Sequence, residues 1–109
     1  MSKKEYQRVK WRLEKVYDFQ NDMFRYRVLR QSTYKILFFT CHDWVYIDGQ
    51  DMKACKYPWK ENYQTVYYNE IVSFKSEQLA REFIEFFEDY RKKMFDVAKE
   101  LENPYIEVN

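Results

Sequence analysis

Glycine, proline, cysteine and histidine are all scarce in this chain of 109 residues, which holds one glycine, two prolines, two cysteines and one histidine. The single glycine, Gly49, excludes a glycine-rich phosphate-binding loop, and so few glycines and prolines exclude a flexible linker. No apolar run has the length of a membrane-spanning helix, and the first residues are charged where a secretory signal would be apolar. We therefore expect one domain over residues 1–109, located in the cytoplasm and not associated with a membrane.

Aromatic and charged residues are abundant instead. Apolar residues make up 46% of the chain and aromatic residues 21%, which is enough for one hydrophobic core without support from a metal or a disulfide. In a reducing compartment Cys41 and Cys55 are expected to be free thiols. Charge is divided along the chain: residues 1–35 hold ten Lys/Arg and four Asp/Glu, whereas residues 36–109 hold nine and fourteen. This division suits docking to a charged macromolecule.

The clearest expected element is a helix that begins after Ser76, whose side chain can cap the first turn. Apolar residues recur every three or four positions from Leu79 to Leu101, and Asn103-Pro104 ends the helix near Glu102. A break near Tyr90-Arg91 is the main alternative. The opposite face of this helix carries acidic residues, and Glu88 with Lys92 has the spacing of an ordinary surface ion pair.

Upstream of residue 76 the period changes to two, which is typical of strands. Residues 9–13 fit a strand or a helical stripe, and we prefer a strand hairpinned onto residues 23–30. The other expected strands are Phe24–Val28, Tyr34–Thr40, Trp44–Ile47 and Tyr63–Tyr68, the last extending in one reading through Phe74. The expected turns are Gln20–Asp22, Arg30–Ser32, His42–Asp43 and Asp48–Gly49, and residues 50–62 form a connection with one short helical turn. The sequence thus predicts an α+β fold, a four- or five-stranded antiparallel meander with the long carboxy-terminal helix packed on one face.

Strand alternation would place Lys10 and Arg12 on the same face as Arg25 and Arg27. Like charges across a sheet destabilise it, so this face is either a docking surface or a solvated face that uses long side-chain stems to cover apolar surface. Exposed aromatic rings are the second expected contact, since such rings often contribute most of the binding energy at interfaces. The predicted partner-binding residues are Lys10, Arg12, Arg25, Arg27, Lys35, Tyr57, Trp59 and Tyr63.

Cys41-His42-Asp43 is the only clustered set of thiol, imidazole and carboxylate. Neighbouring residues on a strand point in different directions, and the chain lacks the paired ligand spacing of a zinc site. No nucleophile accompanies His42 as a general base would require. We therefore predict no catalytic residue, no metal and no cofactor.

The passage from Ile71 to Ile84, a strand leading into a helix within a short chain rich in Tyr, Phe, Lys and Glu, resembles the small accessory proteins of bacteriophages. That resemblance implies a protein that blocks a host defence enzyme by occupying its surface, as anti-CRISPR proteins do. The first functional hypothesis is therefore a non-enzymatic, phage-type inhibitor that binds a host protein or a protein–nucleic acid complex. The alternative is direct binding of single-stranded nucleic acid on the basic, aromatic sheet face, and homodimerisation is compatible with both.

Overall fold

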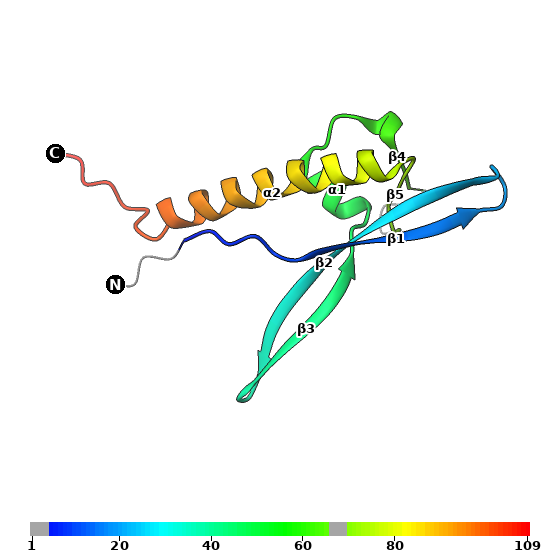
Figure 1. Ribbon diagram of the computed structural model, residues 1–109. Coiled ribbons are helices and arrows are strands. Elements are labelled where there is room, and N and C mark those ends of the chain that lie inside the picture. Colours follow the sequence, from blue (N-terminus) through cyan, green and yellow to red (C-terminus); the bar gives the residue numbers. More distant parts are fainter. Residues whose placement is uncertain (1–4, 66–69) are drawn as a thin grey trace.

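A computed structural model describes residues 5–65 and 70–109. A five-stranded antiparallel sheet packs against one long helix, which confirms the predicted α+β class (Figure 1). The elements are β1 (Trp11–Asp18), β2 (Met23–Ile36), β3 (Phe39–Tyr46), α1 (Gly49–Cys55), the 3-10 turn η1 (Lys60–Asn62), β4 (Tyr63–Gln64), β5 (Ser73–Phe74) and α2 (Glu77–Glu100).

The long strand β2 organises the sheet. Its first half pairs with β1, from Asp18 opposite Met23 to Trp11 opposite Arg30, so residues 11–18 form the strand that the sequence analysis preferred. The other edge of β2 pairs with β5 and then, along its second half, with β3, and β4 lies beside β5. Asp18 shapes the β1–β2 turn, because its carboxylate accepts hydrogen bonds from the backbone amides of Gln20 and Asn21.

Helix α2 begins where its sequence predicted. The Ser76 hydroxyl accepts a hydrogen bond from the Leu79 amide, and the helix continues unbroken through Tyr90 to Glu100. Its first half packs on the sheet and on α1 around a core whose largest fully buried side chains include Phe74 and Phe83. The core therefore lies between one sheet face and the amino-terminal half of α2.

Asp48 and Gly49, expected to form a turn, instead start helix α1. The Asp48 carboxylate accepts from the Asp51 amide while the Asp51 carboxylate accepts from the Asp48 amide, a reciprocal capping box. The expected strand Tyr63–Tyr68 is described only as far as the two residues of β4 and Thr65, since residues 66–69 lie outside the described part of the chain. β5 is a separate strand that runs antiparallel to β4.

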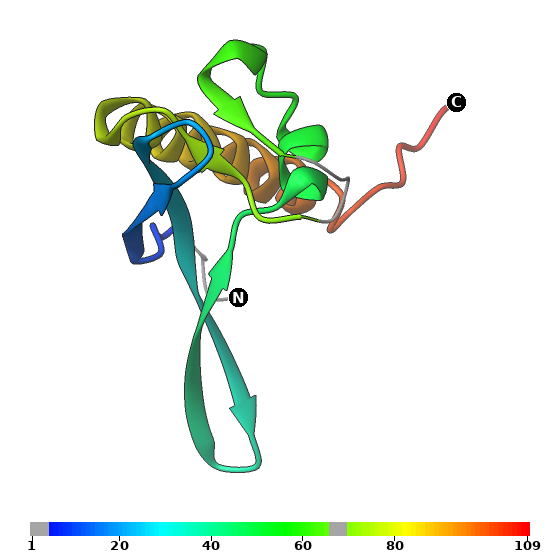
Figure 2. The same cartoon turned by 90° about the vertical axis from the view of Figure 1, so that its right-hand side faces the viewer.

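The second half of β2 and most of β3 leave the body of the protein as a two-stranded arm, residues 31–44. Figure 2 shows this arm as a narrow ribbon pointing away from the helices. Its turn lies at Leu37 and Phe38, inside the segment expected to be one strand, and the turns expected at 30–32 and 42–43 lie within strands. The arm and the far end of α2 give the chain a radius of gyration of 17.3 Å, compared with about 13 Å for a compact domain of this length.

Candidate partner-binding surfaces

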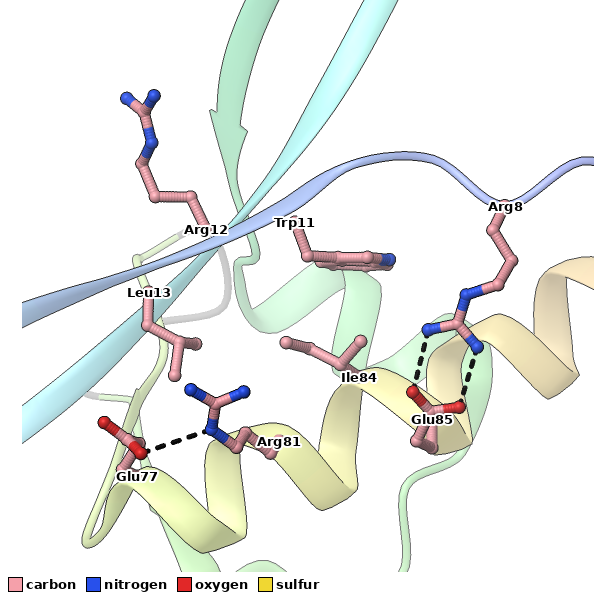
Figure 3. Close-up of a pocket in the computed structure, with 8 residues that line it drawn as sticks. All are labelled: Arg8, Trp11, Arg12, Leu13, Glu77, Arg81, Ile84 and Glu85. Atoms are coloured by element: carbon pink, nitrogen blue, oxygen red, sulfur yellow. Dashed lines mark hydrogen bonds and ion pairs between the residues drawn. The ribbon is translucent and has the colours of Figure 1, made fainter.

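The sheet face turned away from α2 carries the cations that the sequence placed together. The pairing of β1 with β2 places the side chains of Arg12 and Arg27 on the same face of the sheet. Arg25 lies two positions before Arg27 on β2 and therefore shares that face. Lys10 directly precedes β1. The close-up in Figure 3 shows Arg12 pointing away from the helix while Leu13 points toward it. The predicted alternation of the first hairpin is therefore present.

Two of these cations are already engaged within the fold. Arg25 is only 7% exposed, and its guanidinium donates to the hydroxyl of Ser73 at 2.7 Å and to the Ser73 carbonyl at 3.0 Å. Arg27 lies 3.4 Å from Glu14, which also accepts a 2.9 Å hydrogen bond from the Tyr46 hydroxyl. That bond is the main reason why the pKa of Tyr46 is raised. Two of the four predicted cations are therefore held by partners within the fold, Arg25 by Ser73 and Arg27 by Glu14.

Arg12 remains exposed, and its guanidinium lies 4.1 Å from the centre of the Trp44 ring. No ion pair of Arg12 or Lys10 is found within residues 5–65 and 70–109. The stacked Arg12–Trp44 pair and Lys10 are thus the part of the predicted basic face that is open to a partner.

The other predicted contact residues are divided between core and surface. Tyr57 is 5% exposed and its ring packs against those of Phe74, Phe83 and Phe86. The prediction that Tyr57 contacts a partner conflicts with this burial. Trp59 is half-exposed beside it, and Tyr63 is partly buried against the core. Lys35 lies far from both, in the arm.

A cleft of about 490 Å³ lies between β1 and α2, and Arg12 is among the residues that line it. Its apolar floor is made by Trp11, Leu13 and Ile84, as Figure 3 shows. Two ion pairs line it: Arg8 forms a double hydrogen bond with Glu85 at 2.7 and 2.8 Å, and Arg81 pairs with Glu77 at 3.2 Å. The Arg8 hydrogen bonds lower the pKa of Glu85. These four charged groups therefore satisfy one another, whereas Arg12 at the edge of the cleft has no ion pair among the described residues.

Beside this cleft a carboxylate is buried. Glu88, expected on the solvated face of the helix, is 3% exposed. It accepts hydrogen bonds from the Trp11 indole at 2.9 Å, from Arg91 at 3.2 Å and from the Tyr6 hydroxyl. Its ion-pair partner is Arg91 and not the expected Lys92. Glu88 thus joins the basic amino-terminal segment to the helix.

The tip of the arm is an exposed apolar surface that sequence reasoning missed. Four consecutive apolar residues turn the chain here, and Leu37 and Phe38 are 85% and 99% exposed. Leu37 has a φ of 55°, a conformation that costs a leucine about 1 kcal/mol. The exposed residues of the tip are Ile36, Leu37, Phe38 and Phe39. An uninterrupted apolar run with one basic and one polar flank was the available signal, but it also fits a buried strand.

The Cys41-His42-Asp43 sequence forms no reactive cluster. All three residues lie on β3, where neighbours alternate between faces, and the His42 Nδ1 atom lies 3.0 Å from the Thr33 hydroxyl on β2. Burial raises the pKa of the other thiol, Cys55. The described residues include no group of three metal-ligating side chains and no helix long and apolar enough to cross a membrane.

Comparison with known proteins finds no matching family model, no matching curated protein and no matching solved structure. The geometry of the arm and of the sheet face is therefore the basis for the function proposed below.

Proposed function

We propose that this protein is a non-enzymatic binding protein that inserts the tip of the arm into an apolar groove on a partner protein. The supporting observation is the set of four consecutive exposed apolar residues, 36–39, at the end of a projecting ribbon. Soluble proteins rarely expose such a patch unless it is a contact site. A non-glycine residue at positive φ in the turn is a further mark of a functional constraint.

The charge of the arm favours a protein partner over a membrane or a nucleic acid. Between residues 31 and 44 the charged side chains are Lys35 and Asp43, so the arm carries no net charge with His42 neutral. Stable attachment to an anionic membrane through a short apolar segment usually needs a basic patch as well, and nucleic-acid affinity depends on several cations. An apolar protein groove requires neither.

Burial of the tip would supply only part of the affinity. Four apolar side chains contribute about 6–12 kcal/mol when fully buried, and association itself costs a comparable amount. Additional contacts are therefore required. The outer edge of β3 pairs with no strand of residues 5–65 and 70–109, and it offers backbone hydrogen bonds to a partner strand. The Arg12–Trp44 pair lies at the base of the arm on the same sheet.

Occlusion of the partner is the mechanism we propose. The resemblance to bacteriophage accessory proteins gives it a specific form, in which this chain acts in the cytoplasm as an inhibitor of a host defence nuclease or similar complex, in the manner of anti-CRISPR proteins. The arm would occupy a groove that the partner needs for its own substrate.

A variant that keeps the hairpin and removes its apolar tip tests this function. Leu37→Asn with Phe38→Gly places an asparagine, which tolerates positive φ, at position 37 and a conformationally permissive glycine at position 38, so the arm stays folded. Phe19→Ser is the matched control, because Phe19 is equally exposed at the other hairpin turn. Affinity capture from bacterial lysate should recover a partner with the wild type and with Phe19→Ser. The amount of partner recovered with the tip variant should be at least tenfold lower.

Equal recovery by the tip variant, or no specific partner at physiological salt, would overturn the proposal. Sedimentation with vesicles of mixed neutral and anionic lipid provides the competing outcome. Tip-dependent binding to those vesicles without protein capture would mean that the arm recognises a membrane.

Single-stranded nucleic acid remains the second candidate, and the exposed Arg12–Trp44 pair beside Lys10 is the observation that favours it. Arg12 and Lys10 would contact phosphates while the ring offers a stacking surface. Binding of a labelled oligonucleotide should then weaken steeply with added salt and be lost in Arg12→Ala. A flat salt response would exclude this candidate.

A further inference from the structure

The apolar stripe of α2 is longer than the surface that covers it. Its positions alternate by three and four residues, which is the spacing of a coiled-coil seam. They are Ala80, Phe83, Phe87, Tyr90, Met94, Val97 and Leu101. The first three are buried against the sheet, whereas Val97 is 42% exposed and Leu101 62% exposed. One seam is therefore packed over its first half and open over its second.

The open half projects beyond the sheet. Figure 1 shows the orange end of α2 extending past the strands, with the amino-terminal segment alongside it. That segment contacts the helix beside the seam: Tyr6 packs on Phe95 with ring centres 6.0 Å apart, Arg8 pairs with Glu85, and Tyr6 lines a cavity together with Met94. Among the described residues, Met94, Val97 and Leu101 of the seam stay 40%, 42% and 62% exposed.

We propose that a second copy of this chain covers this half of the seam, by antiparallel packing of α2 against α2 of the other copy. Val97 would then face Met94 of the second copy, and Leu101 of the second copy would lie against Tyr90. A cavity of about 390 Å³ opens there, lined in part by Ala54, Phe86, Tyr90 and Met94. It offers an apolar site for the incoming leucine.

Charge complementarity selects this antiparallel orientation. Lys93 and Glu100 flank the seam on the same side, one heptad apart. In the antiparallel pair each Lys93 lies opposite Glu100 of the second copy, which gives two symmetric ion pairs. In a parallel pair Lys93 would lie opposite Ala98 and gain nothing.

The single chain exposes more surface than a compact monomer of its mass. It exposes 8958 Å², whereas such a monomer exposes about 6,600 Å². The arm and the extended residues 102–109 contribute to the difference, as does the open seam. Stable interfaces bury about 1,200–2,000 Å² in total over both partners, so each copy would contribute about 600–1,000 Å² from the seam and the surface around it.

Sedimentation equilibrium of the full chain tests the pairing. We expect a reversible dimer, a shift to monomer in Val97→Glu, and unchanged far-ultraviolet circular dichroism, because Val97 lies outside the core. Lys93→Glu should raise the dimer dissociation constant about tenfold by placing like charges together. The double variant Lys93→Glu with Glu100→Lys should restore it to within about threefold of the wild type, a rescue that a merely structural role would not produce.

This pairing is separable from the function of the arm. The tip variant Leu37→Asn with Phe38→Gly should still dimerise. Val97→Glu should still capture the partner through the apolar tip. A wild type that is monomeric at about 1 mM would overturn the pairing, as would a dimer that Val97→Glu leaves intact. Dimerisation unaffected by Lys93→Glu, or a double variant that dimerises no better than Lys93→Glu alone, would overturn the antiparallel orientation.

Discussion

The carboxylate of Glu88 on α2 accepts a 2.9 Å hydrogen bond from the indole of Trp11 on β1, so the contact between helix and sheet contains a buried ionisable group. Arg91 and the Tyr6 hydroxyl donate to the same carboxylate. A buried charge is tolerated when its hydrogen-bonding capacity is satisfied. The cluster therefore connects the amino-terminal segment, the first strand and the middle of the helix in one arrangement.

We expect Glu88→Ala to lower the free energy of unfolding by about 2 kcal/mol, because it leaves the indole of Trp11 without its acceptor in a partly buried site. Glu85→Ala is the control. Glu85 is exposed and its pair with Arg8 lies at the surface, where such pairs contribute less than about 1 kcal/mol. Urea denaturation of both variants measures the difference. Equal losses of unfolding free energy in Glu88→Ala and Glu85→Ala would show that Glu88 does not hold the amino-terminal segment, the strand and the helix together.

Alkaline pH should weaken the same cluster through Tyr6. Burial, followed by the hydrogen bond to Glu88, raises the pKa of Tyr6 from 10.0 to about 12. The unfolded chain therefore loses this proton first, so the stabilisation is complete below pH 10 and is lost as the pH rises from 10 toward 12. Denaturation midpoints measured across this range should fall more steeply for the wild type than for Tyr6→Phe. If the denaturation midpoints of the wild type and of Tyr6→Phe fell in parallel with pH, Tyr6 would not be the group whose ionisation destabilises the fold.

Much of the fold was predictable because local signals agreed with tertiary packing. The capping residue Ser76 predicted the start of α2, and the spacing of three and four residues predicted its buried face. The alternation of apolar and polar residues on either side of Gln20–Asp22 predicted the first hairpin. The shared face of Arg12, Arg25 and Arg27 followed from alternation alone. The burial and hydrogen bonding of Arg25 did not follow, since Ser73 reaches Arg25 only through the pairing of β5 with β2, which are far apart in sequence.

The arm was not predictable for a different reason. Two-residue hairpin turns normally contain glycine or asparagine, whereas this one contains Leu37 and Phe38. An apolar run without turn residues indicates a continuous buried strand, so this exposed turn has the sequence pattern of a core strand. Tyr57 is the converse case: a ring beside a proline suggested a surface contact, but the structure places it in the core.

Tyr57 and Trp59 should therefore respond differently to truncation. Tyr57→Ala removes a ring that contacts several core aromatics and should cost about 3–5 kcal/mol of stability. Trp59→Ala removes a half-exposed ring and should cost about 1 kcal/mol. Thermal or urea denaturation checks both values. A cost for Trp59→Ala as large as that for Tyr57→Ala would mean that Trp59 is part of the core and not available to a partner.

The positive φ of Leu37 predicts that the arm is less stable than a better turn would make it. Leu37→Gly removes the steric conflict of a side chain in the left-handed region and should stabilise the hairpin by about 1 kcal/mol. Amide protection across residues 33–42 should then rise about fivefold, with little change in global unfolding, because the arm lies outside the core. Leu37→Ile, branched at Cβ, should lower the same protection. If Leu37→Gly lowered protection instead, the leucine side chain would be stabilising the arm, and its exposure at the tip would need another explanation than contact with a partner.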